Sequence, residues 1–259
     1  MIFYFSGTGN TAWAAETIAQ SLNEKLVFIP EHIDKPYTLK LAPHEPLGFC
    51  FPVHGWRPPI VVRQFIQNLI VESTPEYVYA VCTAGDTIGE TVDYLKRDLQ
   101  QVHLHLNAAF SLIMPESYVG LPFMDVDKKD KEREKKQKAL QDLQQYIRII
   151  QERQDNIYKL HIGRWPRINS RIIGAYFVNQ LVTDKPFHVK SERCVKCGIC
   201  ADVCPMNDIT GGLGYEPVWK HNNSCVTCFS CYHHCPHHAI EFGRQTQKKG
   251  QYFYKKNKL

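Results

Sequence analysis

Eight crowded cysteines constrain this chain more than any other feature. Of ten cysteines in 259 residues, eight lie between Cys194 and Cys235. The other two, Cys50 and Cys82, lie in apolar segments typical of strands, where a thiol packs like a small apolar side chain. A disulfide framework suits a small secreted chain, whereas here a large N-terminal part precedes the cysteines and the first residues do not read as an export signal. Metal ligation is therefore the better explanation.

The cysteine spacing occurs twice. It reads Cys194-x2-Cys197-x2-Cys200-x3-Cys204-Pro205 and then Cys225-x2-Cys228-x2-Cys231-x3-Cys235-Pro236. A cubane iron–sulfur cluster needs four thiolates, and a tight loop with cysteines three residues apart supplies three of them. After the longer gap the chain has turned away, helped by the proline, so the fourth cysteine should reach the other cluster. We therefore expect cluster 1 on Cys194, Cys197, Cys200 and Cys235, and cluster 2 on Cys225, Cys228, Cys231 and Cys204.

Structural zinc is the main alternative for these cysteines. Zinc sites favour pairs of Cys-x2-Cys, or mixed Cys and His in fours, over three cysteines in series followed by Cys-Pro. Nearby histidines could suggest a second metal site, at His233, His234, His237 and His238. We expect them instead to be solvated residues that at most tune the charge around Cys235.

The chain opens with an apolar run and a loop of small and hydroxyl residues. Residues 2–5 predict a strand, residues 6–11 a loop, and the apolar spacing that follows a helix. Two glycines let backbone amides converge on an anion, and hydroxyl groups add donors beside the helix N-terminus. The loop lacks the lysine of a triphosphate-binding loop and does not fit G-x-G-x-x-G. A phosphate held by amides and hydroxyl groups alone suits FMN.

Strands and helices continue to alternate through the first half of the chain. Further strands are expected at 26–29, 47–51, 77–82 and 108–114. One helix should open at Pro58-Pro59, and Thr87 with Glu90 should form the capping box of the next. Five strands alternating with helices predict a doubly wound parallel sheet. Ligands in such sheets lie beyond the carboxyl ends of the strands, so the loops after strands one, three and four should meet around one ligand.

Residues 1 to about 114 resemble the flavodoxin family, and residues 5–11 are close to its phosphate-loop signature. The resemblance implies that the FMN phosphate would be held by Ser6, Gly7, Thr8, Gly9, Asn10 and Thr11. One face of the flavin ring would be covered by Pro52, Val53, His54, Gly55 and Trp56, with Trp56 stacking, and the other edge lined by Thr83, Ala84, Gly85 and Asp86. No tyrosine follows Asp86, so the outer ring face should be open to solvent, to a partner or to the chain's own clusters. A scaffold that has lost FMN is the alternative.

Residues 185 to about 244 resemble the bacterial two-cluster ferredoxins, on all eight cysteines. The whole chain resembles the EFR1 family ferredoxins, in which a flavodoxin-like domain precedes the ferredoxin domain. The expected fold class is α/β, a flavodoxin-like five-stranded doubly wound parallel sheet plus a small α+β two-cluster ferredoxin-like domain. The expected parts are an FMN-binding domain at 1–155, a packed connector at 156–184, and the ferredoxin domain with a basic tail at 185–259.

The segments between and after these domains also carry patterns. Charges alternate in sign over residues 125–138, and an apolar stripe follows, which predicts a helix packed on the sheet or the second domain. The stripe consists of Leu140, Leu143, Ile147 and Ile150. Residues 161–187 are too aromatic for a free tether and should pack between the domains. The basic tail at 248–258 should be solvated.

These patterns favour an intracellular, cytoplasmic electron carrier with two 4Fe-4S clusters and FMN, working with a redox partner protein. The alternatives are a flavin-dependent reductase of a small molecule, with His54, Glu116 and Tyr118 near the ring, or a ferredoxin with a flavin-free docking domain. The net charge of +5 is scattered, so a nucleic-acid or membrane surface is not favoured. No run approaches the roughly 20 apolar residues of a membrane span. Donor, acceptor and oligomeric state stay open.

Overall fold

A parallel sheet forms the centre of the larger domain in the computed structural model, which describes residues 1–254. Within these residues the sheet has six strands in the order β2-β1-β4-β6-β7-β8, and every neighbouring pair is parallel. The strands are β1 (Ile2–Tyr4), β2 (Leu26–Phe28), β4 (Leu47–Pro52), β6 (Val78–Ala84), β7 (Ala108–Ile113) and β8 (Ile157–Lys159). The first five follow the flavodoxin order, which confirms the expected fold class.

Strand β8 adds a sixth strand that the sequence analysis did not expect. Its three residues are half-buried and pair with the start of β7. It lies in the segment that we assigned to the connector. A strand this short, without a buried apolar run, leaves almost no periodic signal in the sequence.

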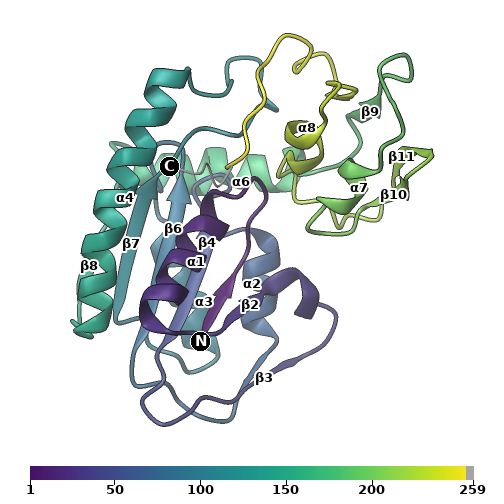
Figure 1. Ribbon diagram of the computed structural model, residues 1–259. Helices are drawn as coiled ribbons and strands as arrows, with labels where there is room; N and C mark the ends of the chain where they lie inside the picture. The colour runs from purple at the N-terminus through teal and green to yellow at the C-terminus, as the bar shows by residue number, and fades with distance from the viewer. Residues whose placement is uncertain (255–259) are drawn as a thin grey trace.

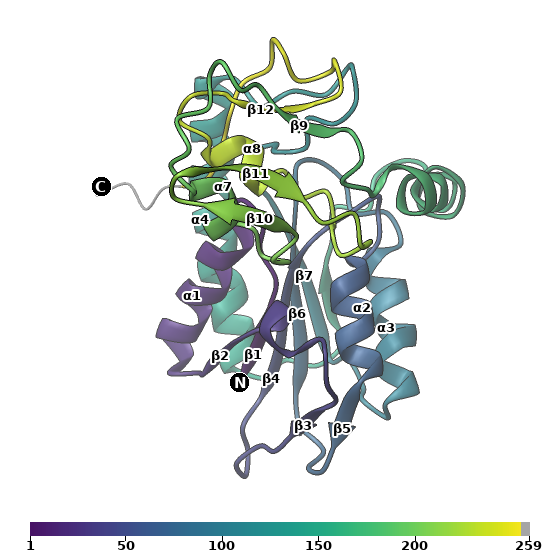
Figure 2. The ribbon, with the colours of Figure 1, turned by 90° about the vertical axis from the view of Figure 1, so that its right-hand side faces the viewer.

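Helices cover both faces of the sheet, which explains why β4, β6 and β7 are apolar along nearly their whole length. Figure 2 shows α1 (Asn10–Leu22) and α4 (Lys129–Gln151) on one side, and α2 (Ile60–Gln67) and α3 (Thr91–Gln101) on the other. Two separate cores result, one against each face of the sheet. The loops at the carboxyl ends of the strands remain available for the rest of the chain.

Two details of these helices differ from the sequence-based expectation. Helix α3 begins at Thr91 and lacks a side-chain cap, so Thr87 and Glu90 do not form a capping box. The carboxylate of Glu90 instead accepts two hydrogen bonds from Arg171, at 2.7 Å each. In α4, which packs on the sheet beside α1, Leu143 is fully buried but Leu140 is 38% exposed. The apolar stripe is therefore narrower than the sequence suggested.

A helical segment, here called the connector helix, follows β8. It consists of α5 (Pro166–Ile168), a π-helical turn (Asn169–Ile173), α6 (Gly174–Tyr176) and a second π-helical turn (Phe177–Leu181). Figure 2 shows it end-on at the right, crossing above α2 and α3. Small elements complete the sheet domain: a 3-10 turn (Ile29–His32) and the parallel pair β3 (Tyr37–Leu39) with β5 (Leu69–Val71).

The C-terminal domain is small and built from short strands and helices. Strand β9 (Phe187–Val189) pairs antiparallel with β12 (Ile240–Phe242), and β10 (Ile209–Gly212) pairs with β11 (Tyr215–Trp219). Helices α7 (Ile199–Asp202) and α8 (Ser230–His234) each contain the third cysteine of a motif, Cys200 and Cys231. Figure 1 shows this domain beyond the carboxyl ends of the central strands.

The described part of the C-terminal tail packs against both domains. Lys249 Nζ donates to the carbonyl of Val119 at 2.9 Å, and the Tyr252 hydroxyl donates to Asn10 Oδ1 at 2.6 Å. The expectation of a solvated tail is therefore wrong for residues 249–254, whereas Lys248 is exposed. Residues 255–258 lie outside the described residues. No helix within residues 1–254 combines the length and apolarity needed to cross a membrane.

Candidate functional site

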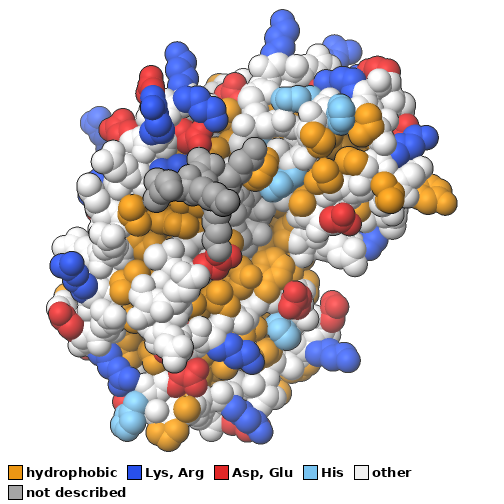
Figure 3. All heavy atoms as spheres, in the orientation of Figure 1, with side chains coloured by type: hydrophobic (Ala, Val, Ile, Leu, Met, Phe, Trp, Pro, Cys, Tyr) orange, Lys and Arg blue, Asp and Glu red, His pale blue; other side chains and the backbone are white. Residues whose placement is uncertain are grey.

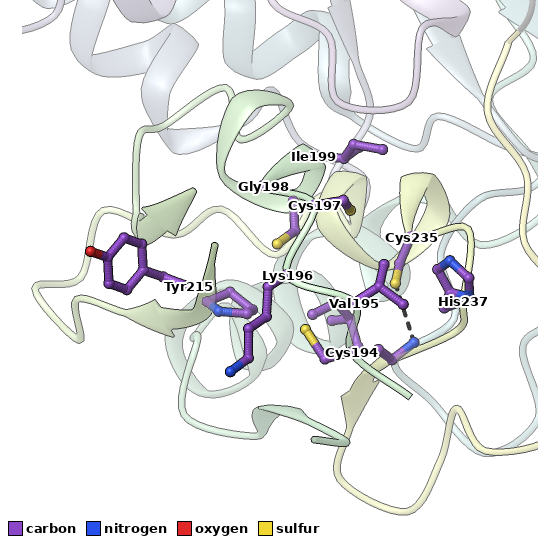
Figure 4. Close-up of a pocket in the computed structure, with 13 residues that line it drawn as sticks. Cys194, Val195, Lys196, Cys197, Gly198, Ile199, Tyr215, Cys235 and His237 are labelled. Atoms are coloured by element: carbon purple, nitrogen blue, oxygen red, sulfur yellow. Dashed lines mark hydrogen bonds between the residues drawn. The ribbon is translucent and has the colours of Figure 1, made fainter. Parts of the chain in front are cut away.

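Four cysteines from the two motifs line one cavity in the C-terminal domain. Cys194, Cys197 and Cys200 come from the first motif and Cys235 from the second. Figure 4 shows Cys194, Cys197 and Cys235 around this cavity, which Lys196, Tyr215 and His237 also line. This is the set that the spacing predicted for cluster 1, including the fourth cysteine from the other motif.

The backbone around this cavity explains how three closely spaced thiols come to face it. Gly198 has a left-handed φ of +81°, and a Cβ there would lie 2.8 Å from the Leu213 amide nitrogen. A β-bridge joins Cys197 to Leu213, so the tip of the β10–β11 hairpin backs the loop. Only glycine allows both this turn and this close approach.

The remaining four cysteines gather at a second place. Burial raises the pKa of the Cys228 thiol to about 12, and the nearby Cys204 contributes to the shift. Cys204 acts on the pKa of Cys225 and Cys231 in the same direction. Cys204 therefore lies near the three thiols of the second motif. Buried thiols of this kind become thiolates readily only beside a positive centre such as iron, so the donor set fits a cluster.

Backbone amides donate hydrogen bonds to three of the eight motif sulfurs. The amide of Asp208 lies 3.3 Å from Cys204 Sγ, and that of Ala239 lies 3.2 Å from Cys235 Sγ. The amide of Thr227 lies 3.4 Å from Cys225 Sγ. Hydrogen bonds to cluster sulfurs are one way in which a protein adjusts a reduction potential. Sequence spacing offers no signal for these donors, because they depend on how each loop folds.

The histidines next to Cys235 divide into two groups. His237 and His238 are exposed, as expected. His233 is only 1% exposed, so its expected solvation is wrong. Its Nε2 lies 2.7 Å from the carbonyl of Ser117, and its Nδ1 accepts the Tyr252 amide at 3.1 Å. Burial lowers the pKa of His233 to about 4, so the imidazole is a neutral link between α8, the tail and the sheet domain.

The loop of residues 6–11 joins β1 to α1 and has the features of an anion site. Gly9 precedes α1 with a left-handed φ of +93°, and no side chain caps the helix. The first turn carries no acidic residue, and the hydroxyl of Ser6 accepts the Gly9 amide at 3.2 Å. A helix N-terminus without a cap or an acid attracts an anion. This end of the predicted FMN site therefore fits a phosphate.

The three predicted FMN loops meet at the carboxyl edge of the sheet. The hydroxyls of Thr11 and Thr83 lie 2.7 Å apart, and the Val53 amide donates to the Thr83 carbonyl at 2.8 Å. Asn10 Nδ2 donates to the Pro115 carbonyl at 3.0 Å, which adds the end of β7 to the same place. The sequence analysis expected this convergence from the strand order alone.

The ring end of the predicted FMN site is covered by the chain itself. A Cβ on Gly55 would lie 2.7 Å from the Phe177 ring and 3.4 Å from the Gly174 Cα, because the connector helix lies on this loop. Trp56 Nε1 donates to the Thr87 hydroxyl at 3.2 Å. A Cβ on Gly85 would lie 2.0 Å from a carboxylate oxygen of Glu116. The loops predicted for the ring end are therefore packed against the connector helix and Glu116 in this arrangement.

Iron–sulfur and phosphate-loop elements touch directly. A Cβ on Gly7 would lie 2.6 Å from the Cβ of Cys228, and one on Gly9 would lie 3.1 Å from the Cβ of Tyr254. The Tyr254 amide also donates to the Thr8 carbonyl at 2.7 Å. The sequence analysis missed these neighbours, because the contacting residues are more than 200 positions apart and no local pattern links them.

Comparison with known proteins agrees with the cysteine geometry. Residues 188–236 match the family model described as a 4Fe-4S dicluster domain. No curated protein matches the chain. A Bacteroides uniformis ATCC 8492 structure that carries the name of a flavoprotein shares 17% identity at a TM-score of 0.35, covering 43% of this chain and 88% of that one. The azoreductase AzrA shares 12% identity at a TM-score of 0.36, covering 56% and 97%. Such low TM-scores carry no weight, so the fold assignment rests on the strand order. This chain therefore contains a 4Fe-4S dicluster domain attached to a flavodoxin-like α/β sheet.

Proposed function

We propose that this protein is an electron carrier with two 4Fe-4S clusters, held in the crossed cysteine sets described above. The family match supports the iron–sulfur clusters, and the shared cavity of Cys194, Cys197, Cys200 and Cys235 supports the crossing. The clusters would pass single electrons, while the protein sets their positions and potentials. The same architecture supports a place among the EFR1 family ferredoxins and a cytoplasmic location.

One observation carries the proposed order of electron transfer. The loop of cluster 2 lies against the phosphate loop, at the contact of Cys228 with Gly7, and its Val226 is 3% exposed within the core of the sheet domain. Cluster 2 would therefore be the cluster nearer to the sheet domain in the order of electron transfer. Cluster 1 lies near exposed apolar side chains, with Leu213 84% and Tyr215 71% exposed. Figure 3 shows apolar side chains gathered over this domain, where a redox partner protein would dock.

The proposal includes FMN, whose phosphate group would bind at the loop of residues 6–11. Residues 6–11 would hold the phosphate through backbone amides and the hydroxyls of Ser6, Thr8 and Thr11. When bound, FMN supplies conversion between one-electron and two-electron steps. The ring-side loops at 52–56 and 83–86 would first have to separate from the connector helix and Glu116. This cover also argues against the reductase alternative, since a small substrate would have to reach the same place.

The first experiment measures iron, acid-labile sulfide and released FMN per chain after anaerobic purification. We expect about eight iron and eight sulfide, as two cubane clusters require. About one FMN would support the flavin site, whereas no FMN and no uptake on its addition would leave a ferredoxin with a docking domain. Zinc in place of iron would overturn the cluster proposal. Cys50→Ala removes a thiol outside both motifs and should keep all the iron.

A further inference from the structure

The connector helix turns large apolar side chains towards solvent. Trp165, Ile168, Ile172 and Tyr176 are 56%, 47%, 67% and 62% exposed. They recur at steps of three and four residues, so they lie along one side of the helix. These four residues are here called the apolar ridge. Figure 2 shows that the helix bearing them stands at the outer margin of the molecule.

Small and polar residues hold the opposite side of this helix in place. The Ser170 hydroxyl accepts the Glu90 amide at 2.8 Å, and the Arg57 guanidinium donates to the Ser170 carbonyl at 2.8 and 2.9 Å. A Cβ on Gly174 would lie 2.1 Å from the carbonyl oxygen of Gly55, so the two backbones touch. The helix is thereby fixed with the apolar ridge outward.

This arrangement reverses the usual amphipathic helix, which buries its apolar side and exposes its polar side. Exposed apolar side chains scattered singly are ordinary, whereas a continuous row of them marks a surface that binds something. The sequence analysis expected this segment to pack between the domains, which is true only of its inner side, where Ser170 and Gly174 are buried.

The charges beside the apolar ridge indicate what it binds. Arg164 and Arg167 directly precede Trp165 and Ile168, and both arginines are exposed. Neither makes an ion pair within residues 1–254, and the Arg164 guanidinium lies over the Trp165 ring at 5.3 Å. Residues 156–183 contain no Asp or Glu. Glu90, the acid that pairs with Arg171 of this helix, is itself buried. An apolar row with Trp and Tyr, bordered by exposed arginines and with no acid in its own segment, matches a helix that lies in the surface of an anionic bilayer.

We propose that the connector helix docks the protein on an anionic phospholipid surface through the apolar ridge, with Arg164 and Arg167 at the headgroups. A bilayer accepts a protruding row of side chains without a preformed groove, which a protein partner would need. Peripheral binding of this kind goes beyond the electron-carrier function and does not depend on it. It would keep the carrier beside redox partners in the membrane.

The test is sedimentation of the holoprotein with phosphatidylcholine vesicles, with and without phosphatidylglycerol. We expect binding to the anionic vesicles only, weakened by salt, and a blue shift of tryptophan fluorescence that is absent from Trp165→Phe. Replacing Arg164 and Arg167 together by Gln should weaken binding about 25-fold, since each basic residue near an anionic surface contributes about five-fold. Ile172→Glu should abolish it.

The matched control is Phe123→Glu, which places the same charge on an 82% exposed apolar residue outside the apolar ridge and outside both cysteine motifs. It should bind like the wild type, and all variants should keep their iron content, so a folding defect is distinguishable. Absence of binding to anionic vesicles would overturn the proposal, as would equal loss in Phe123→Glu. A dimer that Ile172→Glu dissociates, without vesicle binding, would assign the apolar ridge to a second copy of the chain.

Discussion

The two cysteine motifs share their spacing and even a valine, yet their surroundings are opposite. Val195 follows the first cysteine of the first motif and is 56% exposed, whereas Val226 at the equivalent place of the second motif is 3% exposed. The next residues repeat the contrast, because Lys196 is exposed and Thr227 is 2% exposed. One half of the repeat therefore faces solvent and the other is embedded in the sheet domain.

This contrast shows how two motifs with the same spacing come to occupy different surroundings. Thr227 Oγ1 accepts the Thr183 amide at 2.9 Å, and Val226 joins the apolar core beneath the strand ends. Each cluster needs the same ligands, so spacing alone makes the two sites equivalent. Docking against a second domain removes the equivalence and places the second motif beside the loop of residues 6–11, where Cys228 contacts Gly7.

Loss of one ligand should have the largest effect and tests the ligand sets on both sides of the comparison. We expect Cys197→Ser and Cys228→Ser each to lose about four iron atoms per chain, because each removes a ligand of one cubane cluster. Only Cys228→Ser should also make the boundary between the domains sensitive to protease. Iron analysis and limited proteolysis measure the two effects, and unchanged iron in either variant would contradict the assigned ligands.

The valine pair offers a matched test of the burial difference. Val226→Asp should lower the free energy of unfolding by about 3–5 kcal/mol, because an uncompensated charge enters an apolar core. Val195→Asp, on the exposed side, should change it by less than about 0.5 kcal/mol. Denaturant unfolding of the holoprotein compares them. Similar losses in both variants would mean that the two motifs are equally buried in solution.

Gly7→Ala tests the contact between cluster 2 and the phosphate loop. The added methyl group would lie 2.6 Å from the Cys228 Cβ, and overpacking of this kind costs about 1–3 kcal/mol. In combination with Val226→Asp the cost should be smaller than in the wild type, because the contact is already loosened. Strict additivity in this double-mutant cycle would argue that Gly7 and the cluster 2 loop do not touch.

The smallest expected effect is on the pH dependence of stability, through His54 of the sheet domain. Burial lowers the pKa of His54 to about 4 from its ordinary 6.5, so the folded protein keeps this imidazole neutral while the unfolded chain takes up a proton. This contribution to stability is complete above pH 6.5 and is lost as the pH falls towards 4. Between pH 7.5 and 5.5 we expect wild type to lose about 1 kcal/mol more than His54→Gln. Parallel pH profiles would contradict the shift.

Local patterns predicted much of this molecule. The cysteine spacing predicted the four thiols that line one cavity. The apolar runs predicted five strands of the parallel sheet, and the strand order predicted that three loops would meet at its carboxyl edge. Features that depend on distant partners were missed or wrong. Glu90 binds Arg171 instead of capping α3, and His233 is buried because Ser117 and the tail cover it.

The sequence by itself determined the chemistry of the sites, because thiolate spacing and a glycine loop before a helix act within a few residues of each other. Only the tertiary structure decided which motif is buried, which loop is covered and which side of the connector helix faces solvent. Those outcomes depend on contacts such as Gly7 with Cys228 and Gly55 with Gly174. Close packing across more than 100 residues of chain leaves no periodic trace in the sequence, so it appears only once the domains are placed together.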